Sequence, residues 1–565
     1  MGSATLFVAL SRFYALAPAM WDWDEAQFAA GVREYDSGWQ FHHPHPPGFP
    51  IFIALGKLVR FVVRDDFRAL QCVTLIAAMT LLPLAFFVAR ALRFSFATSL
   101  LGALLFAFLP NVWFFGGTAF SDVLGLALTL AAIALLLYGR EDARSFLCGA
   151  LVLGLAAGVR PQAVLFGAAP FAVAAWAQWR ESWRRVLAAC AIVTAVVVIS
   201  YVGAALATSS IEAYVAGVQG LRKWNHDVDS FTSATRAPMT QLLAPFFVRP
   251  FGGGRIGAVI SILALLGLAR GVLRRERGEV LLLALTFVPF GVVSLLSLDP
   301  NSIHRYSIAY AFPYALLAAH ALAPFWKWPR AGQIAVLLAI TLRCGWWTAG
   351  ALADLHRHVP PTGAASRELQ QHARHVWLNP NLRPFGEYFL VGRYTLVSDS
   401  ATLWRTAKAG DAYATEGALD GATVFAMPRG RLWDITRHRY FEVSVLPVGK
   451  LWQFGRGWYA PEPGWRWMDG ESETMLPALE GRGRLRLTIA AQERITPQVE
   501  VWLNGALIER FRCSGEPTTK EWIVNARGDA PNQLIIRSSE TVMLPTDPRA
   551  LSVMLRDYDW APLRE

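Results

Sequence analysis

Residues 19–50 read AMWDWDEAQFAAGVREYDSGWQFHHPHPPGFP and place acids, aromatic residues, three histidines and four prolines between two apolar stretches. The question is why so many polar residues directly follow a first hydrophobic segment, and the composition of the rest of the chain helps to answer it. Of 565 residues, 54% are hydrophobic and only 17% are charged. This composition is unlike that of an ordinary soluble enzyme.

The apolar residues occur in long blocks, such as TSLLGALLFAFL at 98–109 and LAACAIVTAVVVISYVGAALA at 187–207. Blocks of about 20 residues with few charges span a bilayer. After about residue 355 the blocks stop, and charges, aromatic residues and alternating patterns replace them. The sequence therefore predicts a polytopic α-helical membrane domain over residues 1–355, followed by a soluble half.

The net charge of +11 lies almost entirely in the membrane half. Residues 1–360 hold 28 Lys and Arg against 18 Asp and Glu, whereas the remaining residues hold 25 against 24. Positive loops set the orientation of membrane proteins. The soluble half shows no basic face interleaved with aromatic residues, so nucleic acid is not an expected partner. The five cysteines show neither a disulfide framework nor zinc spacing.

Basic clusters predict the orientation, because loops rich in Lys and Arg stay in the cytoplasm. Placing each cluster there gives about 11 transmembrane helices, with the N-terminus inside and the soluble half outside. Residues 2–18 lack the cleavage pattern of a signal peptide, so we interpret them as a retained first helix. The clusters are Arg90 with Arg93, Arg140 with Arg144, Arg180 with Arg184 and Arg185, Arg270 with Arg274, Arg275 and Arg277, and Lys327 with Arg330. The expected spans lie near 3–19, 68–90, 94–112, 117–139, 145–160, 162–178, 186–207, 254–272, 279–297, 305–324 and 331–352.

The stretch FPIFIALGKLVRFVVR, residues 49–64, carries basic residues and would break this alternation if it crossed the membrane. It is better interpreted as a helix lying at the outer interface. Residues 19–50, Asp122, Arg160 and DPNSIHRY (299–306) are then all on the outer face. The polar chemistry therefore collects on one side of the membrane.

In WDWDEAQFAAGVREY, Asp22 or Asp24 can cap the helix that follows by accepting hydrogen bonds from its first amides. Asp24 and Glu25 are also adjacent carboxylates at a membrane surface, followed by the rigid, turn-rich HHPHPPG. The three histidines, His42, His43 and His45, lack the helical or hairpin spacing of metal sites. A divalent metal therefore has no support, and the sequence requires no cofactor.

The order of these features resembles that of the GT-C glycosyltransferases, and within them the protein O-mannosyltransferases and the bacterial lipid A aminoarabinose transferases. An Asp-Glu pair follows the first transmembrane helix, and HPPG comes at 45–48. AFSDVLGLALTLAAIALLL (119–137) is similar to the family's second outer acid at a helix start. GLAAGVRPQAVLF (154–166) is similar to its Gly-rich segment ending in a basic residue, and HRYSIAYAFPYALLAAHAL (304–322) to its Arg-Tyr entry to a late helix.

The resemblance covers roughly residues 5–325 and implies transfer of a sugar from a polyprenyl-phosphate donor at the outer face. It places the general base at Asp24, with Glu25 and Asp122 orienting the acceptor or the donor. A carboxylate base typically contributes about 10²–10⁴-fold. The aminoarabinose transferases carry a basic residue shortly after the Asp-Glu pair, where this chain has EAQF. A phosphate contact from that helix is therefore not expected, and the donor sugar stays open.

The donor phosphate needs fixed positive charge, and the planar fork of arginine suits it. Arg160 and Arg305 are the main candidates, because both are expected at outer helix ends. Snorkelling to the interface is the alternative for both arginines, and capping of the next span is the alternative for Asp122. The remaining candidates are His45 and Lys57 for the phosphate, although Lys57 also suits a lipid surface, and Tyr306 and Trp23 for the acceptor or sugar.

The soluble half divides into two expected domains. Residues 365–447 mix short strands such as TLVSD and ATVFAM with the helix-compatible NLRPFGEYFL, which predicts a small α/β domain. Residues 450–565 predict a jelly-roll-like β-sandwich that resembles carbohydrate-binding modules. RLRLTI alternates apolar and polar residues, and VEVWLNGALIERF places Asn504-Gly505 between two such runs, a strong hairpin signal.

Four tryptophans, Trp452, Trp458, Trp465 and Trp467, gather at the start of the β-domain. They suit stacking on sugars, contact with the membrane interface or packing in the core, and the sequence does not choose among these. The β-domain accordingly either positions a glycan acceptor or braces the transferase.

The sequence thus predicts a multi-pass glycosyltransferase of a bacterial inner membrane, inverting at the anomeric carbon, with its C-terminal domains on the periplasmic side. Its expected partners are a polyprenyl-phosphate sugar, a glycan, lipid or protein acceptor, and membrane lipids. A secondary transporter would show charges within spans and two similar halves, which are absent. A non-catalytic glycan- or lipid-binding scaffold is the other alternative, and it predicts that Asp24 and Asp122 do not converge on one cavity.

Overall fold

The computed structural model describes residues 2–39, 42–274, 277–419, 421–436 and 438–563. They form two compact units. The helical unit comprises Met1–Gly363 with Met427–Phe441, and the C-terminal unit comprises Ala364–Ala426 with Glu442–Glu565. The predicted fold class is confirmed, because the first unit is built from apolar helices and the C-terminal part is rich in strands.

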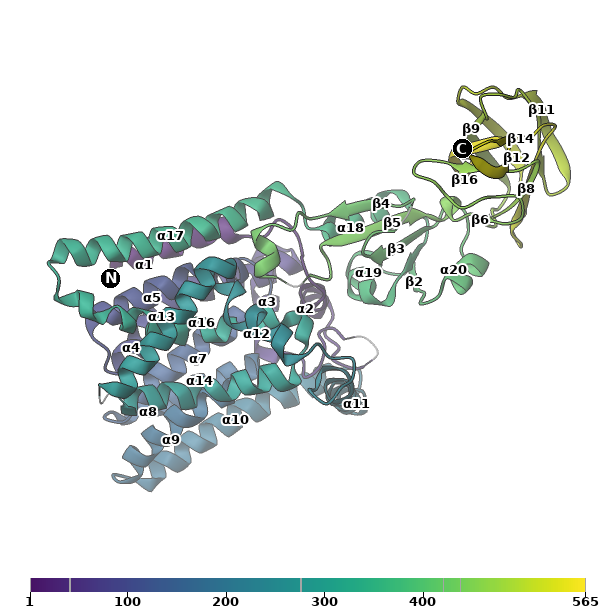
Figure 1. Cartoon of the computed structure of the whole chain (residues 1–565). Coiled ribbons are helices and arrows are strands. Elements are labelled where there is room, and N and C mark those ends of the chain that lie inside the picture. Colours follow the sequence, from purple (N-terminus) through teal and green to yellow (C-terminus); the bar gives the residue numbers. More distant parts are fainter. Residues whose placement is uncertain (1, 40–41, 275–276, 420, 437, 564–565) are drawn as a thin grey trace. The chain divides into compact units, whose positions relative to one another are not determined.

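The long helices of the helical unit lie side by side (Figure 1). Their positions follow the apolar blocks of the sequence, and each expected span overlaps one of them. They are α1 (Gly2–Ser11), α4 (Asp66–Ala91), α5 (Phe96–Phe108), α7 (Ser121–Tyr138), α8 (Ala143–Val159), α9 (Ala163–Trp179), α10 (Trp183–Ala207), α13 (Gly253–Leu273), α14 (Arg277–Ser297), α16 (Ile308–Ala321) and α17 (Arg330–Arg357). Among the described residues, six segments are long and apolar enough to cross a membrane: α4, α7, α10, α13, α14 and Ala331–His372. The protein is therefore a multi-pass membrane protein.

Three expected spans are interrupted. The α1 helix ends at Ser11 and is followed by the 3₁₀ turn η1 (Arg12–Ala15), so residues 3–19 are not one helix. The helix expected over 94–112 ends before Pro110, which begins α6 (Pro110–Phe115), because a residue that precedes proline avoids the helical region. The span expected over 305–324 is preceded by a separate short helix, α15 (Ile303–Tyr306).

Short elements join the long helices. The amphipathic α3 (Pro50–Val63) buries Phe52 and leaves Phe61 and Val62 more than four-fifths exposed. This division of apolar side chains suits a helix in contact with both protein and lipid. The other short elements are α2 (Trp23–Arg33), α11 (Ile211–Trp224), the π-helical η2 (Asn225–Asp229), α12 (Met239–Phe247), η3 (Arg249–Phe251), η4 (Pro300–Ser302) and η5 (Ala323–Lys327).

Small residues let the helices approach closely. Gly267 of α13 lies against the backbone carbonyl of Leu317 in α16, and a Cβ at Gly102 of α5 would stand 3.0 Å from the Cα of Leu316. Membrane helices associate through such close packing, because lipid provides no hydrophobic driving force between them. The α16 helix is thereby fixed between α5 and α13, which determines where α15, at its start, presents its side chains.

Residues 427–441, expected inside the α/β domain, pack with the helical unit instead. This segment contains η7 (Arg431–Asp434), and the ring of His438 stacks on Trp433 at 3.6 Å. Phe441 meets Trp21 edge to face at 5.2 Å, and Arg431 donates to the carbonyl oxygen of Trp347. Aromatic contacts of this kind make the segment a part of the helical unit.

The C-terminal unit begins with a mixed five-stranded sheet in the order β2-β1-β3-β5-β4. The strand β1 pairs in parallel with β2 and β3, whereas β5 is antiparallel to β3 and β4. The elements are α18 (Pro361–His372), β1 (Val376–Leu378), η6 (Pro380–Leu382), α19 (Arg383–Phe389), β2 (Tyr394–Leu396), α20 (Ser400–Thr406), β3 (Ala412–Glu416), β4 (Thr423–Ala426), β5 (Glu442–Pro447) and η8 (Val448–Lys450).

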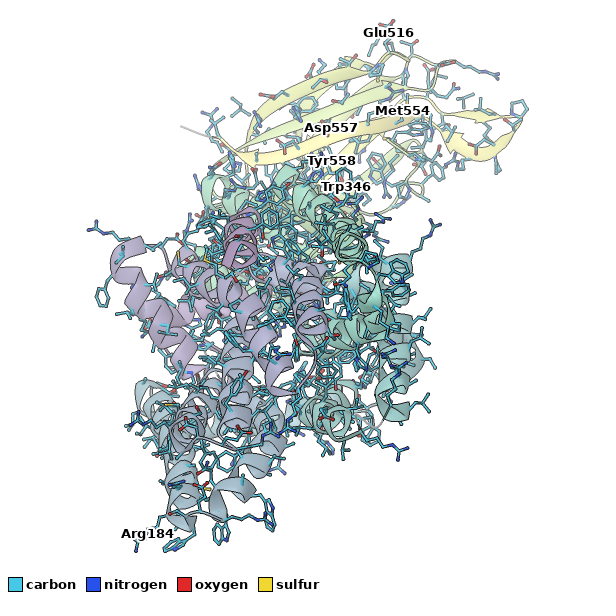
Figure 2. The ribbon with its side chains drawn as sticks, turned by 90° about the vertical axis from the view of Figure 1, so that its left-hand side faces the viewer. Arg184, Trp346, Glu516, Met554, Asp557 and Tyr558 are labelled. Atoms are coloured by element: carbon cyan, nitrogen blue, oxygen red, sulfur yellow. The ribbon has the colours of Figure 1, made fainter. Side chains whose placement is uncertain are left out.

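The chain continues into two further sheets, in the orders β11-β10-β13-β8-β6 and β12-β9-β16-β7, that share one apolar core. The strands of these two sheets are β6 (Gln453–Phe454), β7 (Arg466–Trp467), β8 (Glu471–Leu476), β9 (Arg482–Ala491), β10 (Gln498–Leu503), β11 (Ala506–Arg512), β12 (Thr518–Asn525), β13 (Asn532–Ser538) and β16 (Val553–Pro562). A separate two-stranded sheet pairs β14 (Val542–Leu544) with β15 (Asp547–Leu551). On β16, Asp557 pairs with Arg486 of β9, while Tyr558 packs on the Trp452 ring at 4.4 Å. Asp557 and Tyr558 are labelled in Figure 2.

The alternation expected in β9 is present, since Leu485, Leu487 and Ile489 are fully buried. The predicted hairpin is also confirmed. Asn504 and Gly505 connect β10 to β11 with φ angles of 51° and 86°. Two successive positive φ values are what a tight hairpin turn requires, and Asn-Gly supplies them at low cost.

Candidate functional site

The helix α2 begins with a capping box that accounts for two of its three acids. The carboxylate of Asp22 accepts a hydrogen bond from the amide of Asp24, and the Glu25 side chain accepts one from the amide of Asp22. The spacing Asp22-x-x-Glu25 is the sequence signature of this arrangement. Asp24 is left as the acid whose side chain projects from the first turn.

Glu25 is fully buried and also joins α2 to the loop before α7. One carboxylate oxygen accepts from the amide of Trp21 at 2.6 Å, and the other accepts from the amide of Ala119 at 2.8 Å. Burial raises the pKa of Glu25 to about 7, although these amides act in the opposite direction. Glu25 thus holds the start of α2 beside the start of α7, where Asp122 lies.

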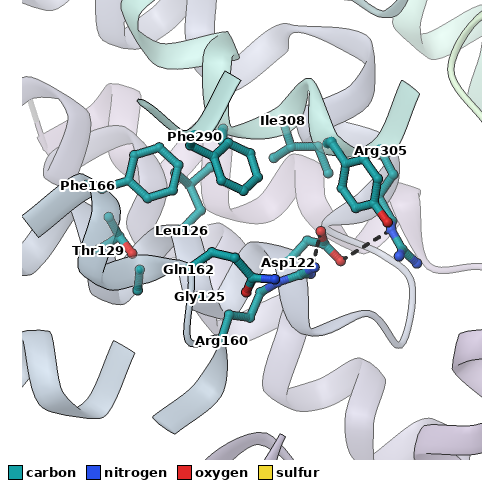
Figure 3. A pocket seen from close by; sticks show the side chains of 13 residues that line it. Asp122, Gly125, Leu126, Thr129, Arg160, Gln162, Phe166, Phe290, Arg305 and Ile308 are labelled. Atoms are coloured by element: carbon teal, nitrogen blue, oxygen red, sulfur yellow. Dashed lines mark ion pairs between the residues drawn. The ribbon is translucent and has the colours of Figure 1, made fainter. Parts of the chain in front are cut away.

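Asp122 and Arg160 come from adjacent helix ends. Asp122 is in the first turn of α7, and Arg160 directly follows the last residue of α8. Nη1 of Arg160 lies 2.5 Å from Oδ1 of Asp122 (Figure 3). It also lies 3.4 Å from the Ser121 hydroxyl. Helices α7 and α8 form an antiparallel pair joined by a short loop at their other ends, which places these two residues together.

Arg305, in the short helix α15, joins the two acids. Its Nη1 donates to Oδ2 of Asp24. Its Nε lies 3.8 Å from Oδ2 of Asp122 (Figure 3). The guanidinium also lies over the rings of Phe120 and Tyr306, at 4.8 Å and 5.5 Å from their centres. Burial disfavours its charge, but the two carboxylates outweigh that effect and raise the pKa of Arg305 well above its usual value.

The four charged side chains are largely withdrawn from water. Their exposed fractions are 13% for Asp24, 10% for Asp122, 16% for Arg160 and 11% for Arg305. Charges in such surroundings interact much more strongly than in water. Two carboxylates balance two guanidinium groups here, so the cluster is close to neutral as long as the arginines face only these acids.

A narrow cavity leads away from this cluster, with a water-accessible volume of about 40 Å³. Its polar end is formed by Asp122, Arg160 and Arg305, and its other end by apolar side chains of α7, α9, α14 and α16 (Figure 3). The apolar lining residues include Leu126, Phe166, Phe290 and Ile308. A volume of this size holds only a few water molecules, so a sugar enters only if side chains move.

One lining residue was not among the sequence candidates. Oε1 of Gln162 is buried and has no hydrogen-bond partner among the residues that the structure describes. A buried polar atom without a partner is costly, which makes Gln162 a candidate ligand-binding side chain. Its place two residues after Arg160 in GVRPQ was the available sequence signal.

The other sequence candidates divide between the site and its surroundings. His45 is close to the acids, with Nδ1 at 2.8 Å from Oε1 of Gln27 and 3.9 Å from Oδ1 of Asp24. Tyr306 lines the cavity, whereas the half-buried Trp23 is not one of its lining residues. Lys57 is exposed and lies 5.8 Å from the Tyr35 ring centre, away from the cavity lining.

A buried histidine and a half-buried one meet beside the site. His304, next to Arg305, meets the ring of His438 at 5.0 Å, and both its ring nitrogens are buried without hydrogen-bond partners in the described part of the chain. His438 belongs to the segment 427–441, so sequence spacing gave no hint of this contact. Across the described ranges, no group of three His, Cys, Asp or Glu side chains is arranged to hold a metal ion.

The sequence matches no family model and no curated protein. Among solved structures, ArnT from Cupriavidus metallidurans in the apo state is similar over 79% of this chain and 98% of that chain, with a TM-score of 0.50 and 12% identity. ArnT bound to undecaprenyl phosphate matches over 81% and 98%, with a TM-score of 0.49 and 12% identity. The mycobacterial arabinofuranosyltransferase AftD matches over 99% of this chain and 61% of that chain, with a TM-score of 0.40 and 12% identity. The likeness to apo ArnT shows that the chain has a GT-C-like fold.

Proposed function

We propose that this GT-C-like protein is a membrane glycosyltransferase that moves a sugar from a polyprenyl-phosphate donor to a hydroxyl group of an extracytoplasmic acceptor. One observation carries the proposal: Asp122, Arg160 and Arg305 form the polar end of an apolar cavity, and Arg305 joins Asp24, from a separate helix start, to this group. A base, a pair of phosphate-binding cations and a lipid-compatible wall are the groups that this reaction needs.

The two arginines are proposed to bind the donor phosphate. Guanidinium forks match phosphate oxygens, and their charge stabilises the phosphate as it leaves with the electron pair of the broken bond. The apolar walls next to them, including Phe166 and Phe290, suit the isoprenoid chain. Undecaprenyl phosphate is the ligand in one ArnT structure, and we propose a ligand of the same chemical class here.

The ion pairs of the site suggest how the donor activates the base. A donor phosphate competes with Asp24 and Asp122 for the same two guanidinium groups. Once Arg305 turns to the phosphate, Asp24 loses its cationic partner, and its carboxylate becomes a stronger base. Donor binding would thereby prepare proton removal from the acceptor.

The proposed reaction is a single displacement. Asp24 takes the proton of the acceptor hydroxyl, the acceptor oxygen forms a bond to the anomeric carbon, and the bond from that carbon to the phosphate oxygen breaks. Attack opposite to the leaving group inverts the anomeric configuration. Asp122 orients the arginines, while Gln27 holds His45, which lies beside Asp24.

Glu25 receives a positioning role in this proposal, because its carboxylate is occupied by backbone amides. Tyr306 is proposed to contact the sugar or acceptor, since it lines the cavity. The position of Lys57 gives no support to a role in phosphate binding. We further propose a bacterial inner membrane, with the C-terminal unit (Ala364–Ala426 with Glu442–Glu565) on the periplasmic side, where the β-sandwich positions a glycan acceptor.

The scaffold alternative predicted that Asp24 and Asp122 do not converge on one cavity. Asp122 lines the cavity and Asp24 does not, but both acids approach Arg305, which lines it, and this shared contact supports the transferase proposal over the scaffold. The test is sugar transfer in proteoliposomes, with a panel of labelled undecaprenyl-phosphate sugars and membrane-derived acceptor fractions. Wild type is compared with Asp24→Asn. The matched control is Asp142→Asn, because Asp142 is an exposed residue that caps the start of α8.

Transfer by wild type and Asp142→Asn that collapses in Asp24→Asn, with donor binding retained, supports the proposal and identifies the sugar. Equal transfer by Asp24→Asn places the base elsewhere. Binding of the lipid-linked sugars without transfer of any of them would overturn the transferase proposal and favour a lipid-binding scaffold.

A further inference from the structure

A second cavity lies between α13 and α17, over α5 and α16, and shares no lining residue with the candidate site. Its volume of about 380 Å³ is in the range of small-molecule pockets. Apart from Arg255, Arg343 and Cys344, its lining is apolar. The apolar lining residues are Leu101, Leu105, Ile256, Val259, Ile260, Leu263, Ala318, Ala319, Leu322, Ala339 and Ile340.

The cavity is a groove that faces outward along two membrane helices. Val259 of α13 is 56% exposed, and Leu342 and Trp346 of α17 are 67% and 71% exposed. Apolar side chains exposed to this degree on helices of this kind face lipid tails, so lipid has access to the groove.

Two arginines interrupt this apolar lining at one end. Arg255 is in the first turn of α13, and Arg343 precedes Trp347 by one turn of α17. A Cβ at Gly253 would stand 3.2 Å from the Trp347 ring, which aligns the start of α13 with this part of α17. Both arginines are therefore near the same end of the groove, and both are exposed.

Neither Arg255 nor Arg343 forms an ion pair with any residue that the structure describes, in contrast to Arg160 and Arg305. A guanidinium group among apolar side chains at a membrane is costly and usually finds a partner or marks a functional site. Asp434 lies near the start of α13, where a Cβ at Gly253 would stand 3.0 Å from its Oδ2, but among the described residues it forms no ion pair with either arginine. The complementary partner is therefore an anion that reaches the groove from the lipid.

We propose that this groove binds a membrane phospholipid with a net negative headgroup. Its phosphate lies between Arg255 and Arg343, and an acyl chain follows the apolar wall formed by α13 and α17. Basic pockets between membrane helices bind acidic lipid headgroups for the same physical reason. This site is separate from the proposed transferase site and does not depend on that proposal.

The test uses the full-length protein in detergent, delipidated and then incubated with dioleoylphosphatidylglycerol, with bound lipid counted by native mass spectrometry. Wild type is expected to retain one such lipid. The double variant Arg255→Gln/Arg343→Gln is expected to retain it about tenfold less, because charge-assisted hydrogen bonds to the phosphate are lost. Arg184→Gln is the matched control, since Arg184 projects from the other end of the helical unit (Figure 2).

A second variant tests the groove without touching the arginines. Ala339→Trp fills the lining and is expected to lower phosphatidylglycerol retention, whereas Leu338→Trp, exposed on the same helix and not part of the lining, is expected to leave it unchanged. Equal retention by wild type, the double variant and Ala339→Trp would overturn the site. Arginine-dependent retention of undecaprenyl phosphate but not of phosphatidylglycerol would overturn the assignment to a phospholipid.

Discussion

Arg305 donates a hydrogen bond to Asp24, although 281 positions separate them in the chain. The same guanidinium approaches Asp122, so one side chain organises both acids. Because each of these groups holds the others in place, substitution of the arginine should affect the site more than substitution of either acid alone.

Arg305→Lys is predicted to weaken donor binding by about 10- to 100-fold, because a lysine keeps the charge but loses the fork that reaches phosphate and carboxylate together. KM for the lipid-linked sugar measures this effect. Arg144→Lys, at an exposed position in the first turn of α8, provides the control. An unchanged KM in Arg305→Lys would remove this arginine from the donor site.

Glu25→Gln is predicted to lower the melting temperature by an amount that corresponds to about 1–3 kcal/mol of unfolding free energy. The new side-chain amide places an N–H against a backbone N–H, which then lacks its acceptor. Transfer activity is expected to fall as well, since Glu25 aligns the starts of α2 and α7. The exposed Glu212, in the first turn of α11, gives the matched variant Glu212→Gln. Equal melting temperatures for Glu25→Gln and wild type would contradict the positioning role.

His304→Phe is predicted to reduce the loss of stability in acid. Burial, together with His438 and Arg249, lowers the pKa of His304 from 6.5 to about 3. Between these values the unfolded chain binds a proton that the folded chain does not, so stability rises with pH and is lost as pH falls below about 6.5. The variant lacks this group, and its stability should fall less steeply.

Melting temperatures at about pH 7.5 and about pH 5 measure this difference. His226→Asn removes an exposed histidine of η2 and is expected to behave as wild type. If His304→Phe and wild type lose stability in parallel, the buried histidine does not set the acid sensitivity.

Gly505→Val is predicted to destabilise the hairpin of β10 and β11 by about 1–2 kcal/mol, because a β-branched residue is strained at a positive φ. Hydrogen exchange of the β10 and β11 amides in the full-length protein reports this change. Gly470→Ala is the control, since Gly470 has no positive φ and a Cβ there would make only an ordinary contact, 3.5 Å from Thr541. Exchange at the same rate in Gly505→Val would show that the turn tolerates the side chain.

The sequence predicted the helices of the membrane half well, because apolar blocks and basic loops are local signals. The prediction of one helix over 94–112 was wrong, because α5 ends before Pro110 and α6 begins with this proline. The capping box at Asp22 and Glu25 was visible in the spacing of the acids. The contact of Glu25 with Ala119 was not visible in the sequence, because it depends on how two helix starts pack against each other.

By itself, the sequence determined a multi-pass helical half, a β-rich C-terminal half and a tight Asn-Gly hairpin, since hydropathy, charge and turn chemistry act over a few residues. Only the tertiary structure decided that Arg305 reaches both acids, that Lys57 does not line their cavity, and that residues 427–441 pack with the helical unit. These outcomes depend on helix packing between segments far apart in the chain, and no local pattern encodes a distance of that kind.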